Sequence, residues 1–220
     1  MKTTIITMTS AFLLTCGQAF AAYSPELQAK AEQGDAAAQY ELGKCYMYDG
    51  VVKWDRQVAV KWCRKAAEQG YAPAQYMLGH WYGLGEGVEM DEVESHKWYR
   101  KAAEQGYAPA QYELGKCYWC GAGVEKDLIQ AARWLCKALE QDDDIESWYI
   151  PDEIKEELRQ AAEQGDAGAQ YQLARCYREG LGVEMDMKQN LREAAKWYRK
   201  AAGQGHAQAQ QELRQLESKE

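Results

Sequence analysis

The chain has 220 residues, of which 46% are hydrophobic, enough apolar material to bury a core, so the composition argues against disorder. A formal net charge of −8 and an isoelectric point near 5.1 argue against a generic nucleic-acid binder or a protein of anionic membrane surfaces, since both need a basic face. The aromatic residues comprise 15 Tyr and 8 Trp but only 2 Phe, and such amphipathic rings suit a binding surface.

The first residues have the pattern of a secretory signal peptide. A positive charge at Lys2 precedes an apolar stretch over residues 5–14, and residues 19–21 form an A-x-A cleavage site. We therefore expect residues 1–21 to be a signal peptide and the mature chain to begin near Ala22. This predicts a periplasmic or secreted protein.

A lipoprotein signal is the alternative interpretation of the same segment. In that case Cys16 would be the acylated residue, although Thr15 is a poor residue before such a cysteine. No later run of the sequence approaches the roughly 18 apolar residues of a membrane-spanning helix. We therefore expect no membrane span in the mature chain.

The rest of the sequence repeats itself. Gly34, Gly70 and Gly106 stand 36 residues apart and open the segments GDAAAQYELGKCY, GYAPAQYMLGHWY and GYAPAQYELGKCY. Gly165 opens a fourth copy, GDAGAQYQLARCY, and Gly205 begins a truncated one, GHAQAQQEL. A fixed period in this range is typical of stacked helical repeats, in which each unit buries its apolar face against its neighbours.

Each unit is predicted to be a helix, a turn and a second helix. In the first helix Ala38, Leu42 and Cys45 fall at i, i+4 and i+7, which makes one core stripe. A glycine-rich turn such as residues 83–88 follows, and the candidate N-caps of the second helices are Asp91, Asp127 and Asp186. The second helices share a tryptophan that we interpret as inter-helix packing: Trp62, Trp98, Trp134 and Trp197.

The pattern predicts an all-α chain with a defined division. After the signal peptide we expect a half-repeat helix over 22–33, repeats at 34–69, 70–105, 106–164 and 165–204, and a capping helix over 205–220. The third repeat carries an insertion at about 142–152, an acidic run followed by an apolar cluster. Insertions in repeat proteins usually emerge as loops on one face, often the binding face, and a solvated spacer is the alternative.

The repeated combination AQYxLGxxYxxGxGVxxD followed by AxxWYRKAAEQG resembles the Sel-one-like repeat family, a relative of the tetratricopeptide repeats. The resemblance covers the chain from Tyr23 to its end, with departures in the first turn, residues 49–52, and after Gln141. It implies a right-handed α/α solenoid that acts as an interaction scaffold, with a concave groove lined by the first helices, but it identifies no partner.

The helical period places one face of each first helix opposite the core stripe. Around Leu42, the residues that point the opposite way are Tyr40, Lys44 and Met47. Applied to every unit, this selects as partner-binding candidates Tyr40, Lys44, Tyr76, His80, Tyr112, Lys116, Trp119, Tyr171, Arg175 and Arg178. A basic and aromatic groove favours an extended acidic segment or a terminal carboxylate. Alternatively, the tyrosines pack between neighbouring first helices.

Six cysteines remain once Cys16 is removed with the signal. They are Cys45, Cys63, Cys117, Cys120, Cys136 and Cys176. An even number in an oxidising compartment permits disulfides, and six cysteines allow 15 connectivities. We expect at least one bridge, whereas others can be small core residues.

The sequence offers little for catalysis. His80, His96 and His206 lie in different units and form no metal-binding motif, and the C-x-x-C of Cys117 and Cys120 lies at a helix end, not after a strand. No S-x-x-K, S-D-N or K-T-G motif occurs. We therefore expect no enzyme, metal or cofactor, although a link between some cysteine-rich family members and penicillin binding makes a β-lactamase-like activity the enzymatic alternative.

These features predict an exported monomeric scaffold that binds a protein or an extended peptide. Two narrower roles stay open. The protein can be an immunity-type protein that neutralises a toxic effector by binding it, or a secreted host-facing factor. The sequence does not choose between them.

Overall fold

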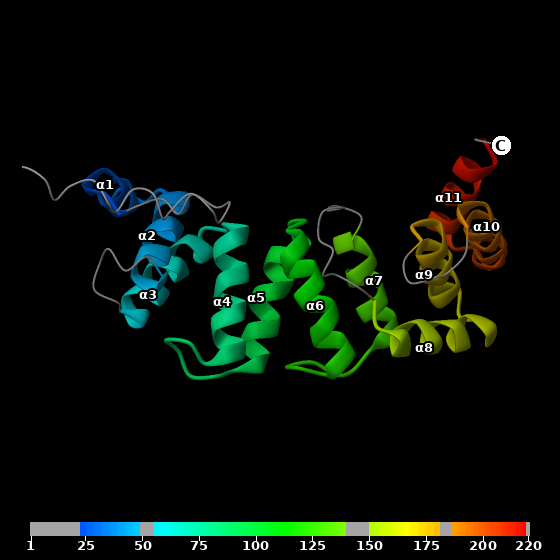
Figure 1. Cartoon of the computed structure of the whole chain (residues 1–220), viewed down its shortest axis with the longest axis horizontal. Coiled ribbons are helices and arrows are strands. Elements are labelled where there is room, and N and C mark those ends of the chain that lie inside the picture. The colour runs from blue at the N-terminus through cyan, green and yellow to red at the C-terminus, as the bar shows by residue number, and fades with distance from the viewer. Residues whose placement is uncertain (1–22, 49–54, 140–149, 181–185, 219–220) are drawn as a thin grey trace, which may run out of the picture.

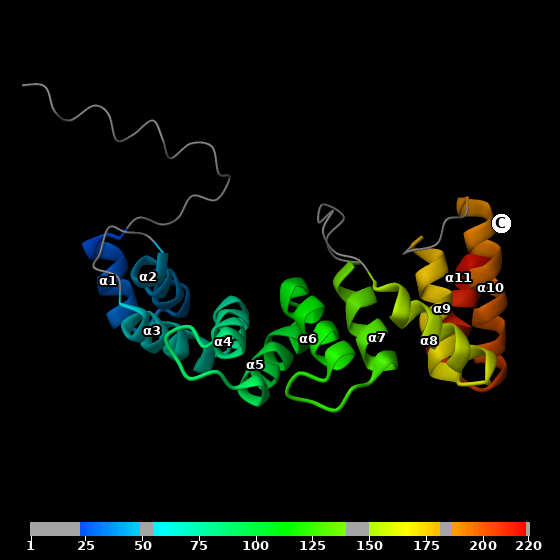
Figure 2. The ribbon, with the colours of Figure 1, turned by 60° about the horizontal axis from the view of Figure 1, so that its bottom comes forward.

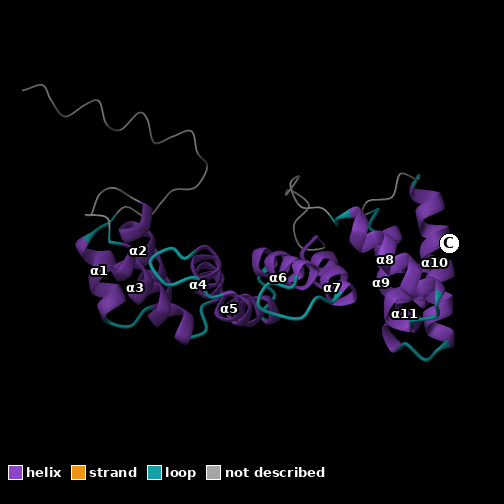
Figure 3. Ribbon diagram, turned by 90° about the horizontal axis from the view of Figure 1, so that it is seen from below, coloured by secondary structure: helices purple, strands orange, loops and turns teal. Residues whose placement is uncertain are grey.

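The computed structural model describes residues 23–48, 55–139, 150–180 and 186–218. The predicted signal peptide, Cys16 and the acidic part of the insertion lie outside these residues. The described part consists of helices joined by turns, without a strand, as Figure 3 shows by its colours. The predicted all-α class is confirmed.

Eleven helices make up the described residues. They are α1 (Pro25–Glu32), α2 (Ala36–Tyr48), α3 (Arg56–Glu68), α4 (Ala72–Leu84), α5 (Glu92–Glu104), α6 (Ala108–Cys120), α7 (Leu128–Leu139), α8 (Asp152–Glu163), α9 (Ala167–Arg178), α10 (Met187–Gly203) and α11 (Ala207–Glu217). They follow one another along the long axis of the molecule, from α1 at one end to α9–α11 at the other (Figure 1). The row is bowed, with the first helices α2, α4 and α6 on the inner side and the second helices α3 and α5 on the outer side (Figure 2).

The turns between the helices follow the predicted glycine chemistry. Gly85 ends α4 in a left-handed conformation, with φ of 72°, which an L side chain adopts only at a cost. Gly123 is required for a different reason, because a Cβ there would stand 2.0 Å from the carbonyl oxygen of Glu92. This turn therefore packs the third unit closely onto the start of α5.

The predicted helix caps are present. Asp91 Oδ1 accepts hydrogen bonds from the backbone N–H groups of Val93 and Glu94, each at 3.0 Å, at the start of α5. Asp127 caps α7 in the same way through the N–H of Gln130. Such bonds satisfy donors that have no partner inside the helix, so they fix where each second helix begins.

Buried glutamines link consecutive units. Gln75 Nε2 donates to the carbonyl of Ala67 at 3.0 Å, and Gln105 Nε2 donates to Gln75 Oε1 at 2.7 Å. The same pair of bonds recurs at Gln39 with Gln69 and at the end of the row in Gln170 with Gln204. The recurring AQY motif and the recurring AEQG motif, which is AGQG in the last unit, thus each supply one half of this link.

The core lies between the two helix layers. Leu42, Leu78 and Leu114 are almost fully buried, which confirms the core stripe of the first helices. Of the repeated tryptophans, Trp98 and Trp197 are buried and Trp62 and Trp134 are half-buried against the core clusters. Their outward faces are covered by the lysine three residues later, with Nζ 4.0–4.6 Å from the ring centre in Lys65, Lys101, Lys137 and Lys200.

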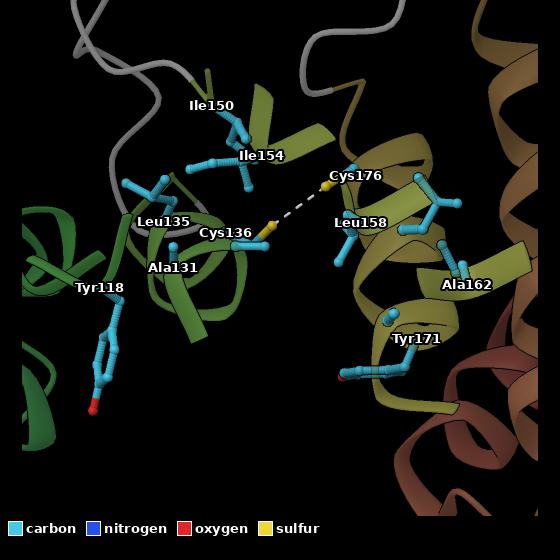
Figure 4. Packing of buried hydrophobic residues seen from close by; sticks show 14 of the residues in the cluster. Tyr118, Ala131, Leu135, Cys136, Ile150, Ile154, Leu158, Ala162, Tyr171 and Cys176 are labelled. Atoms are coloured by element: carbon cyan, nitrogen blue, oxygen red, sulfur yellow. Dashed lines mark hydrogen bonds between the residues drawn. The ribbon is translucent and has the colours of Figure 1, made fainter. Parts of the chain in front are cut away.

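The insertion ends inside the core. Ile150 and Pro151 are buried, and Ile150 belongs with Ile154 and Leu158 of α8 to the cluster that contains Cys136 and Cys176 (Figure 4). The expectation that the insertion emerges as a loop is therefore wrong for Ile150 and Pro151, and the rest of the insertion's apolar cluster lies outside the described residues. The physical reason is that this end leads into an extra helix, α8, whose apolar face needs cover.

Candidate partner-binding surface

The tyrosines of the first helices contact the ring of another tyrosine, which is the N-cap residue of the next first helix. The Tyr40 and Tyr71 ring centres are 5.5 Å apart, and so are those of Tyr76 and Tyr107. These rings are half-buried, so one edge contributes to packing and the other remains accessible. The two interpretations of these tyrosines, packing between neighbouring helices and forming a binding surface, thus apply to the same side chains.

Three residues predicted on the exposed face are buried. Met47 lies in the cluster that contains Trp81 of α4, so the end of α2 is covered by the next unit. Tyr171 and Arg175 of α9 are only 8% and 5% exposed. The prediction of an exposed face is wrong for them, because α7, α8 and α10 all pack against α9.

The burial of Tyr171 has a local cause as well. Its ring stacks on His206 with 4.5 Å between ring centres and also contacts Tyr198 of α10. Arg175 lies over the same ring, 5.9 Å from its centre. Tyr40 of α2 and Tyr76 of α4 hold the same repeat position as Tyr171, but both are only half-buried.

Two of the basic residues predicted on this face form ion pairs with glutamates. Lys44 lies 3.0 Å from Glu41, and Lys116 lies 2.9 Å from Glu113 on the same helix. Burial lowers the pKa of Lys116, but its hydrogen bond to Glu113 and that carboxylate's charge outweigh burial, so the pKa is raised and the lysine stays charged. The face therefore carries both signs of charge, not a row of lone cations.

Two hollows flank α6. The first, of about 250 Å³, lies between α4 and α6 and includes His80, Leu84, Ser95, Tyr99, Lys116 and Cys120. The second, of about 230 Å³, includes Tyr112, Lys116, Trp119, Leu135 and Pro151. Lys116 borders both hollows, and we call the two hollows together with the side of α6 between them the α6 surface.

Hydrogen bonds join the helices around the α6 surface. Ser95 Oγ donates to the carbonyl of Gly79 at 2.7 Å, which holds the start of α5 against α4. Trp119 Nε1 donates to Glu153 Oε2 at 3.2 Å, a bond between α6 and α8. The surface therefore offers apolar walls, hydroxyl groups and both signs of charge, from Lys116 and from the carboxylates of Glu92 and Glu113.

Some of the predicted binding residues meet at this surface and others do not. His80, Tyr112, Lys116 and Trp119 border it. Arg178 lies in a separate hollow of about 580 Å³ between α9, α10 and α11, where it pairs with Glu179 and Glu212. Sequence reasoning missed Leu84, Ser95 and Tyr99, because only the folded chain brings these residues of α4 and α5 to the side of α6. The available signal was Leu84, a large apolar residue between two glycines of a turn.

Neither a metal cluster nor an activated Cys117 thiol is found in the described residues. No group of three or more His, Cys, Asp or Glu in the described ranges is placed to hold a metal ion. Burial, and next the charge of Cys120, raise the pKa of the Cys117 thiol to about 12, so at neutral pH this cysteine is protonated and a poor nucleophile.

The six cysteines of the described residues carry free thiols in the structure. Five are buried and Cys120 is exposed. The prediction of at least one disulfide therefore stays a prediction. Within the same residues, no helix combines the length and apolar character needed to cross a membrane.

Comparison with known proteins identifies the repeat. The family model described as "Sel1 repeat" matches residues 36–71, 72–107, 108–143 and 167–206. Among solved structures, the Sel1 repeat protein from Oxalobacter formigenes is 34% identical with a TM-score of 0.52, over 81% of this chain and 77% of that one.

Two further relatives cover less of their own length. The protein c5321, a protective antigen present in uropathogenic Escherichia coli strains displaying an SLR fold, is 32% identical with a TM-score of 0.53, over 86% of this chain and 50% of that one. A curated relative, DAP3-binding cell death enhancer 1 of Rattus norvegicus, is 45% identical over 56 residues. Those residues are 26% of this chain and 10% of that protein, so the match spans about a tenth of the curated relative.

Proposed function

Because the chain belongs to the Sel1 repeat family, whose members are generally protein–protein interaction scaffolds, we propose that it binds an extended segment of a partner protein at the α6 surface. The observation that carries this proposal is the pair of hollows on either side of α6 that share Lys116. A segment crossing α6 can place one side chain in each hollow.

The size of the hollows favours a peptide over a small-molecule ligand. At about 250 and 230 Å³, each is smaller than the roughly 300–1,000 Å³ of typical small-molecule sites, and each can take one large side chain. The walls contributed by Leu84, Tyr99, Trp119 and Pro151 suit apolar or aromatic anchors.

The charge of the segment follows from the ion pairs. We predicted an extended acidic segment or a terminal carboxylate from the basic and aromatic groove, but Glu41 and Glu113 offset Lys44 and Lys116. A strongly acidic segment would meet these carboxylates as well as the lysines. We therefore propose an apolar segment with one carboxylate or carbonyl group that accepts a hydrogen bond from Lys116.

The test is binding by variants of the full chain. Leu84→Ser with Lys116→Gln removes the exposed apolar wall and the shared charge, so capture of a partner from envelope extracts should fall about tenfold or more. Because both side chains are at least 44% exposed, the melting temperature should stay near that of the wild type.

Lys61→Gln, at an exposed position of α3 away from the α6 surface, is the matched control and should bind the partner normally. Full retention by the α6 variant together with loss by the control would place the partner on the outer face instead. Leu114→Ala is the control for unfolding, because it removes buried volume from α6 and should cost roughly 2–5 kcal/mol.

We also propose that the protein works outside the cytoplasm. The support is the n-region, apolar stretch and A-x-A site of residues 1–21, with acylation at Cys16 as the alternative. Sequencing the N-terminus of protein from envelope and culture fractions should find Ala22 or a residue near it. Unprocessed chain confined to the cytoplasm would contradict export.

Within this proposal the partner can be a toxic effector, which would make the protein an immunity-type inhibitor, or a host protein. Stoichiometric neutralisation of a captured effector by the purified chain distinguishes the first role from the second.

The enzymatic alternative is tested with a chromogenic β-lactam, for which we expect no turnover because no nucleophile with a base and an oxyanion site was recognised. Turnover that a single substitution removes would contradict this expectation.

A further inference from the structure

The interruption of the repeat changes how neighbouring units meet. In the regular part, the second helix α5 packs directly against the next first helix, α6. In the interrupted part, α8 occupies that position before α9, yet α7 also packs against α9. Two preceding helices, α7 and α8, therefore pack against α9, whereas the regular first helix α6 packs mainly against one, α5. We call the contact between α7 and α9 the joint.

Two cysteines face each other in this joint. Cys136 of α7 and Cys176 of α9 have their Sγ atoms 3.6 Å apart (Figure 4). Their exposed fractions are 0% and 1%, and Leu135, Ile154 and Leu158 of the same core cluster enclose them in apolar surroundings. A disulfide has an S–S length of about 2.05 Å, so the sulfur atoms need to approach by roughly 1.5 Å.

The other cysteines have different surroundings. Cys63 packs on Gly43, and its Sγ lies 3.9 Å from the carbonyl oxygen of Tyr40. Cys120 Sγ donates to the carbonyl of Lys116 on its own helix at 2.8 Å. The contact between Cys136 and Cys176 joins two helices that are 40 residues apart in sequence.

We propose that Cys136 and Cys176 form a disulfide that locks α7 to α9 across the interruption. The proposal rests on the proposed export, because structural disulfides persist in oxidising compartments. The bridge closes a loop of 40 residues that contains the whole of α8. It would hold the α6 surface in a constant position relative to the last repeat.

The reaction requires a disulfide oxidant, such as glutathione disulfide or a protein thiol–disulfide oxidoreductase. One cysteine thiolate attacks an oxidant sulfur, which forms a mixed disulfide and releases the first oxidant thiol. The second thiolate then attacks the protein sulfur of that mixed disulfide and releases the second oxidant thiol. Two electrons and two protons pass from Cys136 and Cys176 to the oxidant.

The joint favours one thiolate. The hydrogen bond with Cys136 lowers the pKa of the Cys176 thiol, and the positive charges of Arg175 and Lys155 act in the same direction against burial. Once Cys136 carries the oxidant it cannot donate that hydrogen bond, and the charges of Arg175 and Lys155 are what still favour the Cys176 thiolate as the attacking sulfur in the second step. Because both sulfurs are buried in the folded chain, the first step takes place before the joint closes.

The test is disulfide mapping of the full chain. Purified protein is reduced and unfolded, refolded with glutathione and glutathione disulfide, alkylated and digested without reduction. The expected result is one crosslinked peptide pair that contains Cys136 and Cys176 and disappears with dithiothreitol. Alkylation of both cysteines, or crosslinks to other cysteines instead, would overturn the proposal. The refolding needs neither export nor a partner, so failure of the proposed function would not affect this result.

A second measurement uses the response to reductant. Dithiothreitol should lower the melting temperature of the wild type by about 5–10 °C, since opening a long loop restores conformational freedom to the unfolded chain. Cys136→Ala with Cys176→Ala should melt at the same temperature with and without reductant. Cys63→Ala, which alters an equally buried cysteine, should keep the response. A wild type that does not respond to reductant would also overturn the proposal.

Discussion

The regular region around α4–α6 and the interrupted region around α7–α9 use nearly the same motif in different environments. Lys116 in α6 and Arg175 in α9 hold the same position of that motif, yet the lysine side chain is 44% exposed and the arginine residue only 5%. The difference arises because α8 and α7 both reach α9. A repeat position therefore has no fixed exposure, and the neighbours that the chain supplies decide it.

Charge reversal at these two equivalent positions should give the largest contrast. Arg175→Glu places a carboxylate in a buried site beside Tyr171, so we expect a loss of about 3–5 kcal/mol in the free energy of unfolding. Lys116→Glu should cost about 0.5 kcal/mol or slightly more, because the new carboxylate lies near Glu113 at a partly exposed position. Urea unfolding measures both. Equal losses would mean that α9 is as open as α6.

The glutamine link should show a smaller contrast between the middle and the end of the row. Gln75→Met removes a buried bond to the carbonyl of Ala67 and the acceptor for Gln105, so about 1–3 kcal/mol should be lost. Gln210→Met removes the corresponding bond to Ala202 where the side chain is exposed, and about 0.5 kcal/mol or less should be lost. Similar costs in thermal unfolding would argue against burial as the source of the effect.

A pH effect of smaller size is expected in the regular region. Burial, and next the charge of Arg100, lower the pKa of His96 from 6.5, and its ring packs edge-on against Tyr118. The unfolded chain therefore binds the proton more readily than the folded chain, so this contribution to stability is present above pH 6.5 and is lost as the pH falls through the folded-state pKa.

The measurement is urea unfolding of the wild type and of His96→Gln at pH 7.5 and pH 5.5. The wild type should lose more stability on acidification than the variant, because glutamine does not titrate. An identical loss in the two proteins would show that other groups cause the acid sensitivity.

Much of the fold and part of the site could be predicted from local patterns. The helix positions, the caps at Asp91 and Asp127 and the core leucines follow from spacings within one unit. Lys116 and Trp119 also followed from the helical period, and the structure places both at the α6 surface. The walls supplied by Leu84 and Pro151 did not, since each comes from a different element that reaches the surface only in the folded chain.

The sequence by itself determined the repeated helix pairs, because hydrogen bonds, caps and apolar periodicity act over a few residues and recur in every unit. Only the tertiary structure decided the exposure of Tyr171 and Arg175, the burial of Ile150 and the meeting of Cys136 with Cys176. These outcomes depend on α7 and α8 sharing the surface of α9. That packing joins segments on both sides of the insertion, and no pattern within a single repeat encodes it.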